Sequence, residues 1–146
     1  MRTRVVLLFM MLFSTGYLFG QGKAEGKPKQ HYDCYKGQLT VYTELFLEHV
    51  QYADEGRFVF LEHTNKTGAA AEMRGDWTVL RGDATDENAT VVELDGPGRI
   101  LYFLRRKDGS LQQLDTALKA INPIIRNVLN KERVCRVARK LFGEVK

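Results

Sequence analysis

Serine is almost absent from this sequence, because only Ser14 and Ser110 occur in 146 residues. Histidine is scarce as well, with three residues, and there is no G-x-S-x-G, H-E-x-x-H or phosphate-cradling glycine loop. No pair of motifs places a base beside a nucleophile. The sequence lacks the usual signatures of hydrolases, zinc proteases and nucleotide-binding enzymes, and it predicts a protein that is not an enzyme and uses no cofactor.

Long hydrophobic stretches are also missing, apart from one run of nine residues at positions 5–13. A bilayer-spanning helix needs roughly 20 apolar residues, so this run is too short to cross a membrane. It follows Arg2 and Arg4 and precedes small residues, which is the pattern of a secretory signal peptide at residues 1–20. A buried N-terminal strand or helix is the alternative. No cysteine for a lipid anchor occurs at positions 14–30, so we expect a soluble periplasmic or secreted protein with a flexible polar leader at residues 21–33.

Cysteine occurs twice, as Cys34 and Cys135, 101 positions apart. An even number of cysteines in an exported chain predicts one intramolecular disulfide. Two unpaired thiols, or a soft-metal ligand at Cys34, are the competing interpretations. His31-x-x-Cys34 could offer an imidazole and a thiolate to Cu(I), but two groups are too few for a metal site, so His31 and Cys34 remain weak metal candidates.

Charge is divided unevenly along the chain. Residues 30–125 hold ten basic and fifteen acidic side chains, whereas residues 126–146 hold seven basic and two acidic ones. An acidic body without a basic patch interleaved with aromatics does not favour nucleic-acid binding.

Short alternating runs separated by turn signals predict an all-β domain at residues 34–130. We expect one long strand at 35–48 with a bend near Thr40, a returning strand at 57–63 and another at 69–80. In that third strand Gly75 would allow a close backbone approach beside Trp77, which is expected to plug one end of the sheet or barrel. An antiparallel meander follows, with strands at 77–80, 91–94, 100–104 and 111–114.

The C-terminal part of the sequence fits two structures. Residues 124–129 fit either a helix that begins at Asn122-Pro123 or a closing strand. Within the C-terminal segment (residues 131–146), positions 131–142 place Val134, Val137 and other apolar residues at helical spacing among arginines and lysines. This predicts a short basic amphipathic helix. Its apolar stripe would pack on the domain or, alternatively, lie on an anionic membrane surface.

Several short motifs in fixed order resemble the N-terminal domain of the NlpE-type copper-homeostasis envelope lipoproteins over residues 35–129. The motifs are Tyr35-Lys36-Gly37, Leu45-Phe46-Leu47-Glu48, Gly75-x-Trp77, Val92-x-Leu94, Tyr102-Phe103, Leu111-x-x-Leu114-Asp115 and Ile121. The resemblance implies a small antiparallel lipocalin-like β-barrel in which residues 124–129 form the closing strand. It also implies a binding, copper-homeostasis or stress-response role in the cell envelope.

The sequence departs from that family at two functional points. The family carries a C-x-x-C pair and a lipid-anchor cysteine, and residues 38–44 here contain no cysteine. A carrier of a small apolar ligand is the main alternative function, and its barrel would be lined by aromatic residues. The candidates are Phe58, Phe60, Trp77, Tyr102 and Phe103. A third possibility is an interaction domain that docks on an unknown protein or a membrane through residues 131–142.

Overall fold

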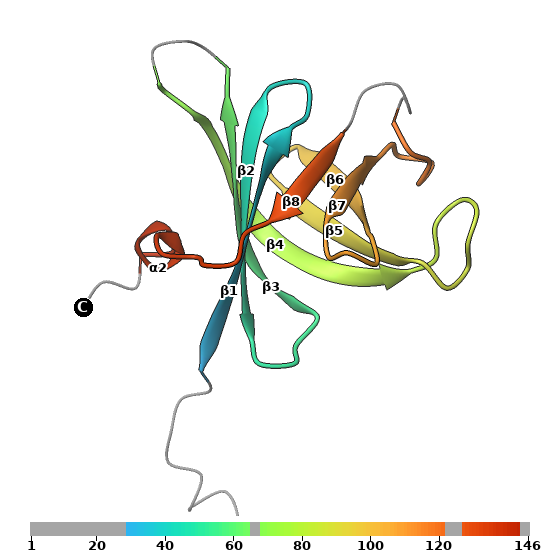
Figure 1. Cartoon of the computed structure of the whole chain (residues 1–146), viewed down its shortest axis with the longest axis horizontal. Coiled ribbons are helices and arrows are strands. Elements are labelled where there is room, and N and C mark those ends of the chain that lie inside the picture. The colour runs from blue at the N-terminus through green and yellow to red at the C-terminus, as the bar shows by residue number, and fades with distance from the viewer. Residues whose placement is uncertain (1–28, 65–67, 122–126, 144–146) are drawn as a thin grey trace, which may run out of the picture.

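A computed structural model describes residues 29–64, 68–121 and 127–143. Within these ranges eight strands form one closed antiparallel barrel, in which each strand pairs with the next and β8 pairs with β1 (Figure 1). The all-β barrel expected from the sequence is confirmed. Its elements are β1 (Gln30–Gln38), β2 (Tyr42–Val50), β3 (Glu55–His63), β4 (Ala71–Arg81), β5 (Thr90–Gly96), β6 (Arg99–Arg105), β7 (Leu111–Leu114) and β8 (Val128–Lys131), followed by the one-turn helix α2 (Ala138–Leu141).

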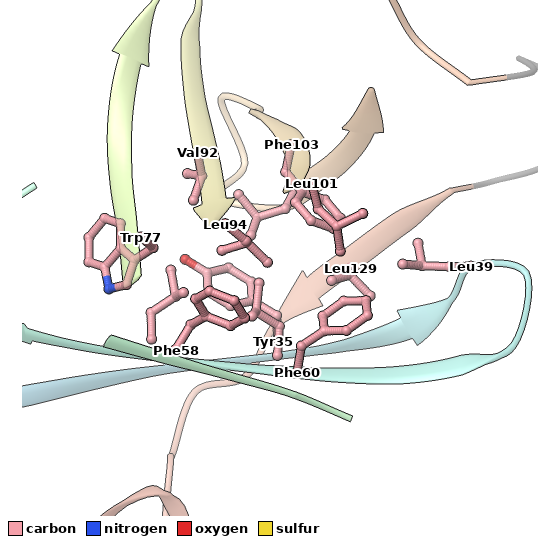
Figure 2. Packing of buried hydrophobic residues seen from close by; sticks show 13 residues of the cluster. Tyr35, Leu39, Phe58, Phe60, Trp77, Val92, Leu94, Leu101, Phe103 and Leu129 are labelled. Carbon is pink, nitrogen blue, oxygen red and sulfur yellow. The ribbon is translucent and has the colours of Figure 1, made fainter. Parts of the chain in front are cut away.

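The interior of the barrel is filled by side chains of alternate residues from every strand (Figure 2). Phe58 and Phe60 of β3 project inward together, as the predicted alternation requires. Thirteen buried residues make up this cluster: Tyr35, Leu39, Leu45, Leu47, Phe58, Phe60, Trp77, Val92, Leu94, Leu101, Phe103, Leu111 and Leu129. Burial of these apolar side chains supplies the main stabilisation of the fold.

The N-terminal part differs from the expected long strand with a bend. The chain turns at residues 39–41, so that β1 and β2 form a hairpin whose last register pair is Gln38 with Tyr42. The Leu39 N–H and the Thr43 hydroxyl both donate to the carbonyl of Val41, which stabilises this turn. The strand β1 also begins at Gln30, inside the predicted leader, because residues 30–33 pair with the last residues of β2.

The predicted helix at 131–142 is wrong over most of its length. Lys131 still belongs to β8, and the Glu132 N–H donates to the Cys34 carbonyl at 2.7 Å, which extends the pairing with β1. Helical structure is limited to Ala138–Leu141. Backbone pairing at one end and the bond from Cys135 therefore outweigh the helical periodicity. Of the closing strand expected at 124–129, positions 128 and 129 lie in β8, and positions 124–126 lie outside the described residues.

Gly75 lies where β4 passes from one neighbour to the other. Residues 71–78 of β4 pair with β3, and residues 76–81 pair with β5. A Cβ at Gly75 would overlap the carbonyl oxygen of Asp95 and would lie 3.0 Å from the Phe58 ring. The predicted close approach of the backbone at this position is confirmed, because the absence of a side chain lets the sheet fold over the core here.

Gly75→Ala is therefore expected to lower the free energy of unfolding by about 3 kcal/mol, since the carbonyl of Asp95 belongs to the β4–β5 pairing and cannot move without cost. Urea unfolding followed by circular dichroism measures the change. Thr78→Ala, an outward position on the same strand, is the control and should cost much less. Equal losses for the two variants would show that packing against Asp95 does not set the requirement for glycine.

Candidate functional site

The five predicted pocket residues do not share one cavity. Phe58, Phe60 and Phe103 are at most 1% exposed and Trp77 is 4% exposed, and all four belong to the packed interior cluster (Figure 2). Tyr102 lies between two inward-facing residues and therefore points to the outer face. Four of these side chains therefore lie in the core and the fifth lies on the outer face, and a ligand cavity inside the barrel stays a prediction.

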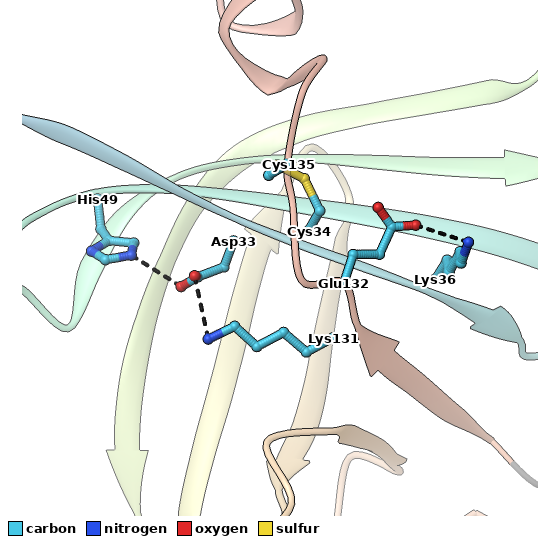
Figure 3. Close-up of a disulfide and its surroundings, with 7 residues drawn as sticks. All are labelled: Asp33, Cys34, Lys36, His49, Lys131, Glu132 and Cys135. Atoms are coloured by element: carbon cyan, nitrogen blue, oxygen red, sulfur yellow. Dashed lines mark hydrogen bonds and ion pairs between the residues drawn. A yellow bond between two sulfur atoms is a disulfide. The ribbon is translucent and has the colours of Figure 1, made fainter.

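The predicted disulfide joins Cys34 to Cys135, with their Cα atoms 5.5 Å apart (Figure 3). Cys34 points outward from β1 and packs in a second buried cluster with Phe46, Val59 and Phe142. Phe142 comes from the end of the C-terminal segment, whereas the other members lie on β1, β2 and β3. The disulfide and Phe142 thus fasten the C-terminal segment to the outer wall of the barrel.

A small polar network lies beside this disulfide (Figure 3). Asp33 contacts the Nε2 of His49 at 3.0 Å through one carboxylate oxygen, and the Nζ of Lys131 at 3.4 Å through the other. On the opposite face of β1, Lys36 pairs with Glu132 at 3.2 Å, which raises the pKa of the lysine. The Asp33–Lys131 pair links β1 to β8, and the Lys36–Glu132 pair links β1 to the residue that follows β8. Both ion pairs therefore stabilise the junction at which the barrel closes.

Three rings lie in a row across the end of the barrel near Asp33. His31 stacks on His49 with ring centroids 5.8 Å apart, and the rings of His49 and Trp77 are perpendicular with centroids 5.9 Å apart. Trp77 donates its indole N–H to the carbonyl of Glu48 at 2.9 Å. A Cβ at Gly56 would overlap that carbonyl, so the missing side chain makes room for the indole. Trp77 therefore has the predicted role of a plug at one end of the barrel.

The weak copper hypothesis at His31 and Cys34 finds no support in this geometry. The two residues are three positions apart on one strand, so their side chains lie on opposite faces of the sheet. Cys34 is bonded to Cys135 and offers no thiolate. The Nε2 of His31 is buried without a hydrogen-bond partner among the described residues. Within the same residues, no group of three or more histidine, cysteine, aspartate or glutamate side chains could hold a metal ion.

The C-terminal segment presents a basic and partly apolar surface. Val134 and Val137 are 59% and 55% exposed, although both were expected on an apolar stripe. Four basic side chains, Arg133, Arg136, Arg139 and Lys140, are exposed around them. Leu141 and Phe142 of the expected stripe pack against the barrel.

An acidic groove of about 530 Å³ lies on the wall formed by β3, β4 and β5. Glu55, Asp76, Glu93 and Asp95 line it, and Asp76 stands directly opposite Asp95. Arg57 also lines the groove and forms a two-bond ion pair with the buried Glu48, at 2.6 and 2.9 Å. Partial burial and the nearby carboxylates of Glu93 and Asp95 raise the pKa of Tyr102.

Tyr35 gives a prediction for alkaline pH. Its side chain is 3% exposed, and burial, with a smaller contribution from Asp33, raises its pKa to about 12. A phenol whose pKa is higher in the folded state stabilises the fold fully below pH ~10, and this contribution is lost as the pH rises to about 12. We expect a loss of roughly 2–3 kcal/mol over that window from this group.

Tyr35→Phe should remove that part of the pH dependence. The comparison is made by urea unfolding of both proteins between pH 9 and pH 12, so that the other tyrosines and the lysines contribute equally. Parallel stability curves for the two proteins would contradict the assignment to Tyr35.

Sequence reasoning missed His49, Asp33 and Lys131 as a group. They lie far apart in the chain and match no local motif. Only the register of the β1–β2 hairpin brings His49 opposite His31 and near Asp33. One signal was available in the sequence. These residues have odd numbers, as do inward-facing residues such as Tyr35 and Leu45, so alternation places them on the same face of the sheet.

Comparison with protein-family models, with curated proteins and with solved structures finds no match for this chain. Among the described residues, none of the helical structure is long and apolar enough to cross a membrane.

Proposed function

We propose that this chain is an exported, non-catalytic β-barrel protein that binds partners through its outer wall, with the accessory role in the cell envelope that the NlpE resemblance implies. The observation that carries the proposal is that the two buried clusters lie on opposite sides of the barrel wall. Interior side chains occupy the barrel, while Cys34, Phe46, Val59 and Phe142 hold the C-terminal segment on the outside. The side chains left free to meet a partner are on the outer surface.

Two observations support export. The chain begins with two arginines and an apolar run that has the pattern of a signal peptide. Cys34 and Cys135 lie at disulfide distance, and such bonds persist in oxidising compartments. The two features are independent, because one is a property of the leader and the other of the folded domain.

The side chains that could take part in catalysis, Asp33, His49 and Ser110, are already engaged in hydrogen bonds or ion pairs, and this supports binding over catalysis. Asp33 and His49 form a contact that could orient a base, but Asp33 also pairs with Lys131. Ser110, the serine within the described residues, is 3% exposed and donates its hydroxyl to Asp108 at 2.6 Å in the β6–β7 turn. These groups stabilise the structure where they stand.

Cell fractionation followed by native mass spectrometry tests the proposal. We expect protein in the periplasmic or secreted fraction, processed near residue 20, with a mass that fits one disulfide and no retained small molecule. Cytoplasmic protein with two free thiols would contradict export. A retained apolar ligand of several hundred daltons would favour the carrier function instead.

A further inference from the structure

We propose that the C-terminal segment is a docking surface for a bilayer that contains anionic lipids. This inference rests on the proposed function, because it names the partner of the outer wall. The surface consists of Arg133, Val134, Arg136, Val137, Arg139 and Lys140. It lies outside the barrel, with α2 beside β1 (Figure 1).

The positive charges of this surface have no carboxylate partner in the part of the chain that the structure describes. Among the described residues, no carboxylate lies within salt-bridge distance of Arg133, Arg136, Arg139 or Lys140. Two arginines of the barrel wall are paired instead, Arg57 with Glu48 and Arg99 with Glu62. Four cations within eight residues, none of them paired with a described carboxylate, are attracted to a surface of negative charge.

The two valines of the same surface are exposed to solvent. Val134 and Val137 remain exposed, whereas Leu141 and Phe142 are used to attach the segment to β1, β2 and β3. Exposed valines alternate with arginines along the chain, so apolar side chains could enter the lipid interface while the cations meet the head groups. A purely electrostatic partner would explain the arginines but would leave the valines in water.

The disulfide attaches this surface to the barrel. Cys135 lies between the two valines, and its bond to Cys34 fixes the middle of the segment to β1. The segment need not lose much chain entropy on binding, because its backbone is already held at both Glu132 and Phe142.

Co-sedimentation with vesicles tests the inference on the full-length processed protein in its oxidised form. The vesicles are phosphatidylcholine alone, or phosphatidylcholine with phosphatidylglycerol. We expect binding only to the anionic vesicles and its loss at high salt. Arg133→Gln with Arg136→Gln should weaken the partition coefficient by about 25-fold, since each basic side chain near such a surface contributes roughly fivefold. Val134→Ser with Val137→Ser should weaken it several-fold.

The control variant is Arg106→Gln with Lys107→Gln, which removes the same charge from the exposed β6–β7 turn and should leave binding unchanged. Equal weakening by both arginine-containing double variants would overturn the inference, because binding would then follow net charge. Absence of vesicle binding would overturn it too. Sedimentation velocity tests a different partner, a second copy of the chain. Salt-sensitive self-association that the Arg133 and Arg136 changes abolish, without vesicle binding, would also overturn the inference. The partner would then be the acidic groove of a second copy. If the protein is exported and oxidised but does not bind vesicles, the proposed function stands and only the lipid partner falls.

Discussion

Replacing both cysteines with alanine is expected to lower the free energy of unfolding by about 4–5 kcal/mol. The bond between Cys34 and Cys135 spans a sequence separation of 101 residues, and a cross-link over that length strongly restricts the unfolded chain. A domain of this size has a total stability of about 5–15 kcal/mol, so the variant would be close to unfolding. Alanine is preferred to serine because Cys34 is 2% exposed, and a hydroxyl there would be buried.

Guanidinium unfolding with and without reductant measures this effect. Reduced wild-type protein should approach the stability of the Cys34→Ala/Cys135→Ala variant, and reductant should leave that variant unchanged. The prediction would be falsified if the double variant lost less than about 1 kcal/mol, since the cross-link would then contribute little to restricting the unfolded chain.

Phe103→Ala is expected to lower the free energy of unfolding by about 3–5 kcal/mol. The Phe103 side chain has no exposed surface and lies in the interior cluster with Leu101 and Leu111. Removing the ring leaves a cavity in addition to the lost transfer free energy, and a closed sheet can collapse around it only in part.

The neighbouring Tyr102 provides a matched control, because it is the same size class and points to the outer wall. Tyr102→Ala should cost at most about 1 kcal/mol. The pair also tests the nature of the interior. If Phe103→Ala were nearly neutral and the purified protein retained an apolar molecule, the barrel would have to be regarded as a carrier rather than a filled core.

Alternation along single strands was readable from the sequence, and the interior positions of Phe58, Phe60 and Trp77 followed from it. The turn at residues 39–41 was not readable. Tyr35 pairs with Leu45 across the β1–β2 hairpin, so inward residues carry odd numbers on both sides of the turn. The period of two therefore continues through the turn without a break, and one long strand gives the same pattern as a tight hairpin.

In the C-terminal segment the sequence pattern is clear, but it predicts the wrong structure. Val134, Val137, Leu141 and Phe142 carry a clear helical period, but the sequence does not show how strongly the neighbouring backbone is held by β1. The Cys34–Cys135 pair was predicted from export and cysteine number alone. The ring row of His31, His49 and Trp77 depends on the register of four neighbouring strands, β1 to β4, which no local pattern encodes.

Closure of the barrel depends on its shortest strands. β8 meets β1 at Tyr35–Lys131 and Lys36–Asn130, and it meets β7 at Leu111–Leu129 and Gln112–Val128. If β8 separated, β1 and β7 would become free sheet edges with unpaired N–H and C=O groups, which readily add a strand from another molecule. By tying β1 to the chain just beyond β8, the disulfide protects against aggregation through strand exchange. Reducing conditions should therefore favour fibrillar or swapped assemblies, whereas the oxidised protein is expected to remain monodisperse.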